Sequence, residues 1–143
     1  MTARGRWPSE AFVTQAVWKA LKRKGFKPHP QKSLHAHGVD ITARHPTHRY
    51  YIFVECKGYP KGYSEGAQRD NYFLMILGQI LLRMRQKNAY YAVALPDHDF
   101  YRERILSRDF RWARKWLGLW FFLVKCDGRV LWLDAKRKAF RAY

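Results

Sequence analysis

Acidic residues are scarce in this sequence, where 11 Asp and Glu stand against 28 Lys and Arg and leave a formal net charge of +17. Cysteine is scarcer still. Cys56 and Cys126 make no disulfide framework, and we expect both to be small buried hydrophobic residues. The longest apolar run, residues 117–124, contains a glycine and is far shorter than the roughly 20 residues of a membrane-spanning helix. These deficits exclude a disulfide-stabilised scaffold and argue against a membrane protein.

The chain nevertheless has enough apolar material to fold, because 48% of its residues are hydrophobic and 17% are aromatic. Its 143 residues suit one domain, 1–143, and no repeat, low-complexity tract or linker divides them. The first ten residues, MTARGRWPSE, lack the apolar segment of a signal peptide. We therefore expect a single folded domain in the cytoplasm.

The surplus of positive charge is the first functional indication. It makes the folded chain repel itself unless an anionic partner offsets it, and nucleic acid is the commonest such partner. Basic residues concentrate in residues 83–87, 102–115 and 136–141, although one such run alone is typical of a solvated helix face. Six Trp and nine Tyr supply further surfaces for stacking on bases. We expect a nucleic-acid-binding protein, with anionic lipid and ribosomal RNA as the alternative partners.

The first half of the chain predicts a helix followed by strands. Ser9 can cap a helix whose apolar residues recur at helical spacing and which ends at Gly25. Residues 26–37 contain two prolines, which predict an edge strand or an extended connection. Residues 38–45 and 49–58 are two strand-like runs around HPTH, which indicates an antiparallel hairpin. A loop then follows up to about Asp70.

The second half predicts a helix over residues 70–87, a buried strand over 89–96 and a basic helical region over 99–117, broken near Ser107. The first of these helices should bury one apolar side, formed by Phe73, Leu74, Leu77, Ile80, Leu81 and Met84. Residues 119–134 should form a hairpin, because Asp127-Gly128 is a two-residue turn signal. The fold class expected is α/β, a mixed sheet flanked by helices on both faces, with a C-terminal helix and β-hairpin added.

The hairpin places two acids and a base together. Glu55 and Lys57 follow the apolar run YYIFV and share one face of the strand, since side chains alternate along it. With a turn at about Pro46 and Thr47, Asp40 lies opposite Phe53 and is a diagonal neighbour of Glu55, about 7 to 8 Å away between backbones. Two carboxylates held so close favour a cation between them, and oxygen ligands suit a hard divalent ion. Such a site, with an ammonium beside it, can hydrolyse a phosphodiester.

The same residues carry a family resemblance. GVD (residues 38–40) and ECK (residues 55–57), with an apolar strand between them and a helix before and after, resemble the PD-(D/E)xK nuclease superfamily. The element order resembles its restriction-endonuclease-like αβββαβ core over about residues 8–96, and the basic extension 97–143 is unmatched. Within the superfamily, the chain is most similar to archaeal-type Holliday junction resolvases and Mrr-like restriction endonucleases.

This resemblance implies roles for individual residues. Asp40 and Glu55 would bind Mg²⁺ or Mn²⁺ together with the carbonyl of Cys56, and Lys57 would be the catalytic lysine. Glu10 and Gln79 fall where related families place further polar site residues. Glu10 also has a second interpretation, because a carboxylate in a first turn favours the helix dipole. Gln79 could likewise be a hydrogen-bonded amide in an apolar stretch.

The function that we expect from these signals is a metal-dependent endodeoxyribonuclease, structure-specific for junction or branched DNA, or related to restriction or repair. A homodimer is expected, with the aromatic hairpin 119–133 as its interface unless core burial explains that hairpin. The alternatives are a non-catalytic nucleic-acid-binding module of a repair or mobile-element complex, and an RNA nuclease. The basic residues expected to bind nucleic acid are Lys61, Arg102, Arg104, Arg108, Arg111, Arg114 and Lys115.

Other polar residues support weaker hypotheses. A zinc site could use His35 and His37 or His45 and His48, but the cysteine pairs of structural zinc are missing. His35 or His37 could instead contact phosphate near Asp40. Tyr59 and the nearby Tyr63 follow the motif and could stack on bases or simply lie on an exposed loop.

Overall fold

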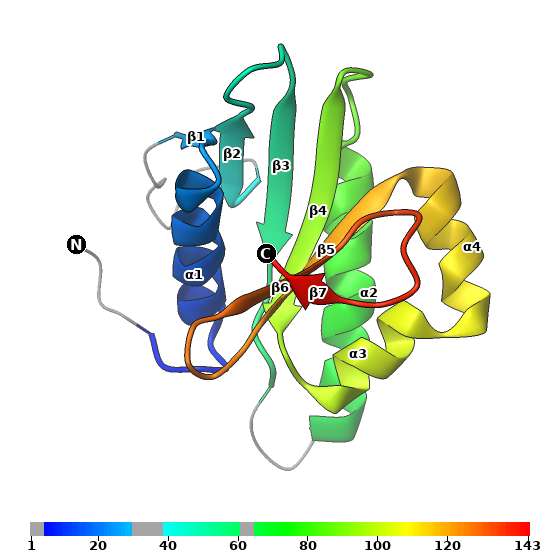
Figure 1. The fold of residues 1–143 in the computed structure, drawn as a ribbon. Helices are drawn as coiled ribbons and strands as arrows, with labels where there is room; N and C mark the ends of the chain where they lie inside the picture. The colour runs from blue at the N-terminus through cyan, green and yellow to red at the C-terminus, as the bar shows by residue number, and fades with distance from the viewer. Residues whose placement is uncertain (1–4, 30–38, 61–64) are drawn as a thin grey trace.

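The computed structural model of the chain describes residues 5–29, 39–60 and 65–143 (Figure 1). Its helices and strands follow the predicted order as far as β4, and two helices and three strands come after it. In chain order the elements are α1 (Glu10–Arg23), β1 (Lys27–Pro28), β2 (Ile41–Arg44), β3 (Tyr51–Cys56), α2 (Glu65–Arg83), β4 (Ala89–Pro96), α3 (Asp99–Leu106), α4 (Arg108–Leu117), β5 (Leu119–Val124), β6 (Val130–Leu133) and β7 (Arg141–Ala142).

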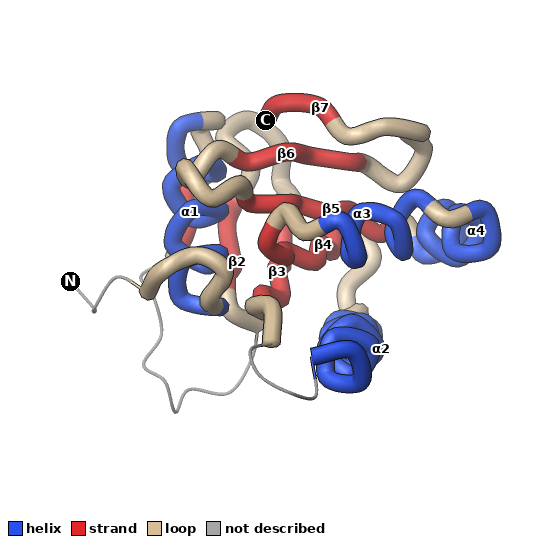
Figure 2. Tube along the Cα trace, turned by 90° about the horizontal axis from the view of Figure 1, so that it is seen from below, coloured by secondary structure: helices blue, strands red, loops and turns tan. Residues whose placement is uncertain are grey.

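The strands form one mixed, curled sheet in which each strand pairs with the next along the chain. β3, β4 and β5 are parallel to one another, and the remaining neighbours are antiparallel. Helix α1 covers one face and α2, α3 and α4 cover the other, as Figure 2 shows in the view from below. Strand residues alternate between the two cores: Ile52, Val54 and Cys56 face α1, whereas Phe53 packs into the second core. The expected α/β sheet flanked by helices is confirmed.

The ends of α1 follow from its sequence. The Ser9 hydroxyl accepts a hydrogen bond from the Phe12 amide at 3.2 Å, as an N-cap should. Gly25 has a φ of 90°, which suits glycine, and the Phe26 amide turns back to donate to the Leu21 carbonyl at 3.0 Å. Both predicted ends are therefore confirmed to within two residues.

The hairpin β2–β3 is antiparallel as predicted, but its register differs by two residues. Thr42, not Asp40, lies opposite Phe53, and Ile41 lies opposite Val54. The reason is a longer turn: the His45 amide donates to the Tyr50 carbonyl and closes a four-residue loop. A shift of two residues preserves the face on which each side chain lies, so Asp40 stays on the side of Glu55 and moves directly beside it.

The limits of α2 and its buried side differ from the prediction. The helix begins at Glu65, because Ala67, Gln68 and Arg69 are good helix formers that extend it towards the N-terminus, and it ends at Arg83. Phe73, Ile76 and Ile80 are buried. Leu74 and Leu81, expected inside, are 66% and 44% exposed. Residues 71–84 are apolar on more than one side, so helical spacing alone did not identify the side that faces the sheet.

The C-terminal part confirms the predicted break, since Ser107 ends α3 and caps α4 by accepting from the Phe110 amide. The β5–β6 hairpin is also confirmed, with a three-residue loop in place of the predicted two: Lys125 pairs with Arg129, and Gly128 has a φ of 90°. β5 is an interior strand, so core burial explains its aromatic residues. The short strand β7 carried no sequence signal. Among the described residues, no helix is both long and apolar enough to cross a membrane.

Candidate active site

Asp40 and Glu55 meet at the carboxyl end of β3. The Cys56 amide donates to Asp40 Oδ2 at 2.7 Å, which fixes the Asp40 carboxyl beside the strand. Burial and the charge of Asp40 raise the pKa of the neighbouring Glu55 carboxyl, which favours a proton on one member of the pair. The sequence prediction that these two acids converge on one face is confirmed.

Glu55 is nearly inaccessible to solvent, with an exposed fraction of 5%. Burial, together with the charge of the neighbouring Asp40, raises the pKa of Glu55 to about 8, although Arg83 opposes this rise. Arg83 Nε lies 3.5 Å from Glu55 Oε1, at the C-terminal end of α2. A carboxyl pair in this state at neutral pH retains one proton or exchanges it for a cation.

Lys57 lies on the same side of the sheet as Glu55. Its ammonium is 4.6 Å from the centre of the Tyr72 ring on α2, and its amide donates to the Ala94 carbonyl at 3.0 Å. That backbone bond continues the parallel pairing of β3 with β4 by one residue beyond the strand. The Lys57 backbone is thus part of the rigid sheet, while the ammonium is held over an aromatic face.

Glu10 comes to the site from the first turn of α1. Loss of hydration raises the pKa of Glu10, Asp40 raises it further, and Lys57 lowers it, so all three charges act on one another. The helix dipole also favours a carboxylate here, so the two interpretations of Glu10 are compatible. The predicted set of three acids and one lysine is brought together.

Gly58 explains how α1 can approach so closely. A Cβ at Gly58 would lie 2.7 Å from the Pro8 carbonyl oxygen and 2.8 Å from the Glu10 amide nitrogen. The Tyr59 amide donates to that same Pro8 carbonyl at 3.0 Å. Only glycine allows the start of α1 to press against the chain just after the motif.

Aromatic side chains hold the same segment from the α3 side. The buried Tyr101 hydroxyl donates to the Gly58 carbonyl at 2.9 Å. The Tyr59 ring stacks on His98 with 3.8 Å between ring centres, next to the start of α3. Tyr59 therefore has an intramolecular stacking partner, and Tyr63 lies outside the described residues.

Both cysteines were predicted to be buried, and the structure confirms this only for Cys56. Cys56 is buried on the α1 face, where Thr14 hydrogen-bonds its thiol and burial raises its pKa. Cys126 lies exposed in the β5–β6 loop, contrary to the prediction that it is buried, because that loop projects beyond the sheet.

The oxygen ligands of the candidate site suit Mg²⁺. Among the described residues, no three His, Cys, Asp or Glu side chains lie close enough to hold an ion by themselves. Asp40 and Glu55, with the Cys56 carbonyl, would leave positions for water, which is how proteins bind Mg²⁺. A divalent cation would relieve the repulsion between the buried Glu55 carboxyl, whose pKa is raised, and the half-buried Asp40 carboxyl beside it.

The histidines that the structure describes do not form a zinc site. His45 Nδ1 accepts hydrogen bonds from the Thr47 and His48 amides, so its ring stabilises the hairpin turn. The His45 and His48 rings lie 4.7 Å apart, and each also contacts Tyr50. This turn is at the opposite end of β3 from Glu55. His35 and His37 lie outside the described residues.

On α2, the structure places Arg83 at Glu55, while Gln79 is exposed to solvent. Sequence reasoning named Gln79 and missed Tyr72 and Arg83 as neighbours of the site. A signal did exist: Tyr72 and Arg83 are three helical turns apart and flank the buried Ile76 and Ile80 on one side of α2.

The predicted nucleic-acid-binding residues separate into three groups. Arg108, Arg111 and Lys115 are exposed on α4. Arg102 and Arg104 are paired with Asp97 and Asp70 at 2.7 and 2.9 Å. Arg114 is only 1% exposed and donates to the Arg137 carbonyl, so it is not part of the basic surface as predicted; it lies on the inward side of α4. Lys61 lies outside the described residues.

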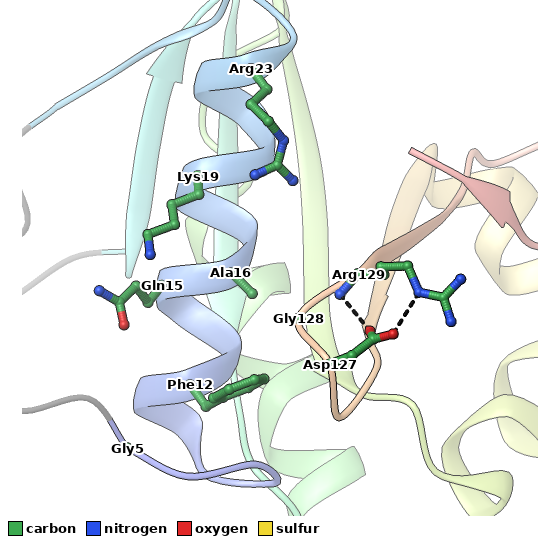
Figure 3. Close-up of a pocket in the computed structure, with 9 residues that line it drawn as sticks. All are labelled: Gly5, Phe12, Gln15, Ala16, Lys19, Arg23, Asp127, Gly128 and Arg129. Atoms are coloured by element: carbon green, nitrogen blue, oxygen red, sulfur yellow. Dashed lines mark hydrogen bonds and ion pairs between the residues drawn. The ribbon is translucent and has the colours of Figure 1, made fainter.

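A separate hollow of about 460 Å³ lies between α1 and the β5–β6 loop (Figure 3). Its lining includes three cationic residues, Lys19, Arg23 and Arg129, around the apolar Phe12 and Ala16. Arg129 is held by Asp127, at 2.7 Å between Nε and Oδ2. This hollow does not include Asp40, Glu55 or Lys57, so it is a basic surface distinct from the candidate site.

Comparison of the chain with protein-family models, curated proteins and solved structures gives no match.

Proposed function

We propose that this protein is a metal-dependent endodeoxyribonuclease with a restriction-endonuclease-like core. The observation that carries the proposal is the carboxyl pair of half-buried Asp40 and buried Glu55, held at a strand end beside Lys57 and Glu10. Burying Glu55 next to a second acid costs stability, and a purely structural strand end needs neither of them. Supporting this, the chain carries a charge of +17 that suits a polyanionic substrate.

Each residue then has a separate role. Asp40, Glu55 and the Cys56 carbonyl would bind Mg²⁺ or Mn²⁺, which would supply Lewis-acid stabilisation of phosphate charge and a more acidic water. The Lys57 ammonium would donate a hydrogen bond to a phosphate oxygen or orient the attacking water. Glu10 would hold a second water or accept its proton, since burial raises the pKa of Glu10 above its usual value and makes it a stronger base. Arg83 lowers the pKa of Glu55 and so favours the charged form that would bind a cation.

The exposed face of α4 is the nucleic-acid contact that we propose. Arg108, Arg111 and Lys115 are exposed there, and they lie beside Trp112 and Trp116, which are 64% and 82% exposed. Basic side chains next to exposed aromatic rings suit phosphates and unpaired bases respectively. This arrangement favours DNA with a single-stranded or branched portion. A cytoplasmic location stays a prediction.

Two alternatives would use the same surface. A non-catalytic DNA-binding module of a repair or mobile-element complex would need the basic face of α4 but not the carboxyl pair. An RNA nuclease would need both, and no described contact distinguishes ribose from deoxyribose. The carboxyl pair favours catalysis over binding alone.

The experiment is metal-dependent cleavage of labelled single-stranded, duplex, flap and four-way-junction DNA, with matched RNA substrates. Glu55→Gln, Asp40→Asn and Lys57→Met should each lower the cleavage rate at least about a hundredfold, because each removes a group that acts on the reacting phosphate. Glu103→Gln, an exposed acid on α3, is the matched control. Binding without nicking in Mg²⁺ and Mn²⁺ would reject the enzyme, and cleavage that survives all three substitutions would reject the site.

A further inference from the structure

Helix α2 has a second apolar side that nothing in the described part of the chain covers. It consists of Leu74, Met75, Gly78, Leu81 and Leu82, which we call the α2 stripe. The four large side chains are 66%, 46%, 44% and 74% exposed, in that order. Four such residues together on one helix side are typical of a surface that meets a partner.

The α2 stripe is symmetric about Gly78. Leu74 and Leu82 lie four residues before and after it, and Met75 and Leu81 lie three residues before and after it. If two α2 helices cross antiparallel at Gly78, Leu74 of each meets Leu82 of the other, and Met75 meets Leu81. This self-complementary order is what a two-fold interface requires, because the same patch must serve on both subunits.

No contact in the described part of the chain explains the glycine at position 78. Glycine weakens a helix interior relative to alanine, and glycine is useful where another backbone approaches. A Cβ at Gly78 would meet no atom of the described residues within 4 Å, so no contact among them needs the space. The missing side chain therefore leaves room for something outside the chain, at the centre of the α2 stripe.

Charge favours a second copy over other occupants. Residues 74–82, LMILGQILL, contain no charged side chain, so two stripes can meet without bringing like charges together despite the net charge of +17. The cations of α2 point elsewhere: Arg83 contacts Glu55 and Arg69 lies over the Phe100 ring. A phosphate backbone or an anionic membrane would need cations beside the stripe.

We infer that this protein forms a homodimer through antiparallel packing of α2 against α2 of a second copy, centred on Gly78. The interface lies on the opposite side of α2 from Tyr72 and Arg83, which contact Lys57 and Glu55. The dimer would therefore hold two candidate sites in a fixed two-fold relation. This inference does not depend on cleavage and differs from the aromatic hairpin expected as the interface.

The test is sedimentation velocity of the full chain over a range of concentrations. The wild-type protein should be a dimer, and Leu74→Lys or Leu82→Lys should raise the dissociation constant about a hundredfold or more, since each buries a charge in the interface. Gly78→Leu should also give a monomer, while keeping the far-ultraviolet circular dichroism of the folded chain because the position is open. Trp116→Lys, at an 82% exposed position on α4, is the matched control and should stay dimeric.

Disulfide mapping tests the antiparallel arrangement, in a Cys126→Ser background that removes the exposed native cysteine. Leu74→Cys mixed with Leu82→Cys should form a disulfide between the two variants, and neither should link to itself. Self-linking of either variant would overturn the antiparallel packing. A chain that stays monomeric, a Gly78→Leu protein that dimerises as well as wild type, or a monomer that binds anionic vesicles through the stripe would overturn the inference, whether or not the protein cleaves DNA.

Discussion

Asp40 lies beside Glu55 at the end of β3, although the hairpin turn and most of two strands separate them in the sequence. Asp40 also accepts the Cys56 amide, so its position is fixed by the backbone of the strand that carries Glu55. The two acids therefore form one unit whose protonation and cation binding are linked.

The stability of the protein should fall as pH rises, because the folded pKa of Glu55, about 8, is above its unfolded value. The contribution of this protonation is present below about pH 4.5 and is lost as pH rises through 8, with a maximal slope of about 1.4 kcal/mol per pH unit for one proton. Thermal unfolding in EDTA between pH 5 and 9 measures it. Glu55→Gln should remove most of this dependence, whereas an unchanged profile would contradict the raised pKa.

Magnesium should stabilise the protein more at pH 8.5 than at pH 5.5, because the cation competes with the proton on the carboxyl pair. The measurement is the shift of the unfolding temperature with added MgCl₂ at each pH. Asp40→Asn should abolish the shift, and Glu103→Gln should leave it unchanged. Equal shifts in wild type and Asp40→Asn would place magnesium binding elsewhere.

Arg83→Met should raise the pKa of Glu55 further, since Arg83 is the cation that lowers it. We expect the pH at which half-maximal Mg²⁺ stabilisation occurs to move upward by about one unit or less, because Arg83 is itself partly exposed. Arg85→Met, an exposed cation just beyond the same helix, is the control. An equal shift for both variants would indicate a general charge effect.

Gly58→Ala should displace the start of α1, since its Cβ would meet the Pro8 carbonyl and the Glu10 amide at less than 3 Å. The expected cost is about 1 to 3 kcal/mol in the free energy of unfolding, together with loss of the influence of Glu10 on the site. Denaturant unfolding measures the first and the cleavage rate the second. Gly66→Ala, where an added Cβ meets nothing, should be neutral or stabilising.

Trp112→Ala and Trp116→Ala should each weaken binding to single-stranded DNA about tenfold, because base stacking on an aromatic side chain is worth about 1 to 3 kcal/mol. Fluorescence anisotropy with a labelled oligonucleotide in EDTA separates binding from cleavage. Trp116→Phe should retain most of the affinity. Duplex binding that is lost equally in the alanine variants would point to a structural effect on α4.

The sequence predicted those features that depend on local chemistry. Ser9 caps the start of α1, and Ser107 ends α3 and caps the start of α4, because each hydroxyl accepts a backbone amide within one helical turn. Gly25 follows the end of α1, because glycine readily adopts the backbone conformation needed there. The convergence of Asp40 and Glu55 was also predictable, since alternation of side chains survives an even change of register.

Features that depend on the whole fold were not predictable in the same way. The register of β2–β3 was wrong by two residues because the His45 ring stabilises a longer turn. Arg114 was expected on the surface, but it is buried under the chain that leads to β7, and that strand had no signal of its own. Leu74 and Leu81 were expected inside because an apolar residue at helical spacing does not reveal which side faces the sheet.

The order of the strands in the sheet has a consequence for how the chain is built. Every strand pairs with the one that precedes it, so the sheet can grow from one edge while the polypeptide is synthesised, and no later strand has to insert between two earlier ones. Glu10, Asp40 and Lys57 are all present early, but the Tyr101 hydroxyl that anchors Gly58 arrives only with α3. A nascent chain would therefore carry the charged groups of the site before it can hold them in their final arrangement.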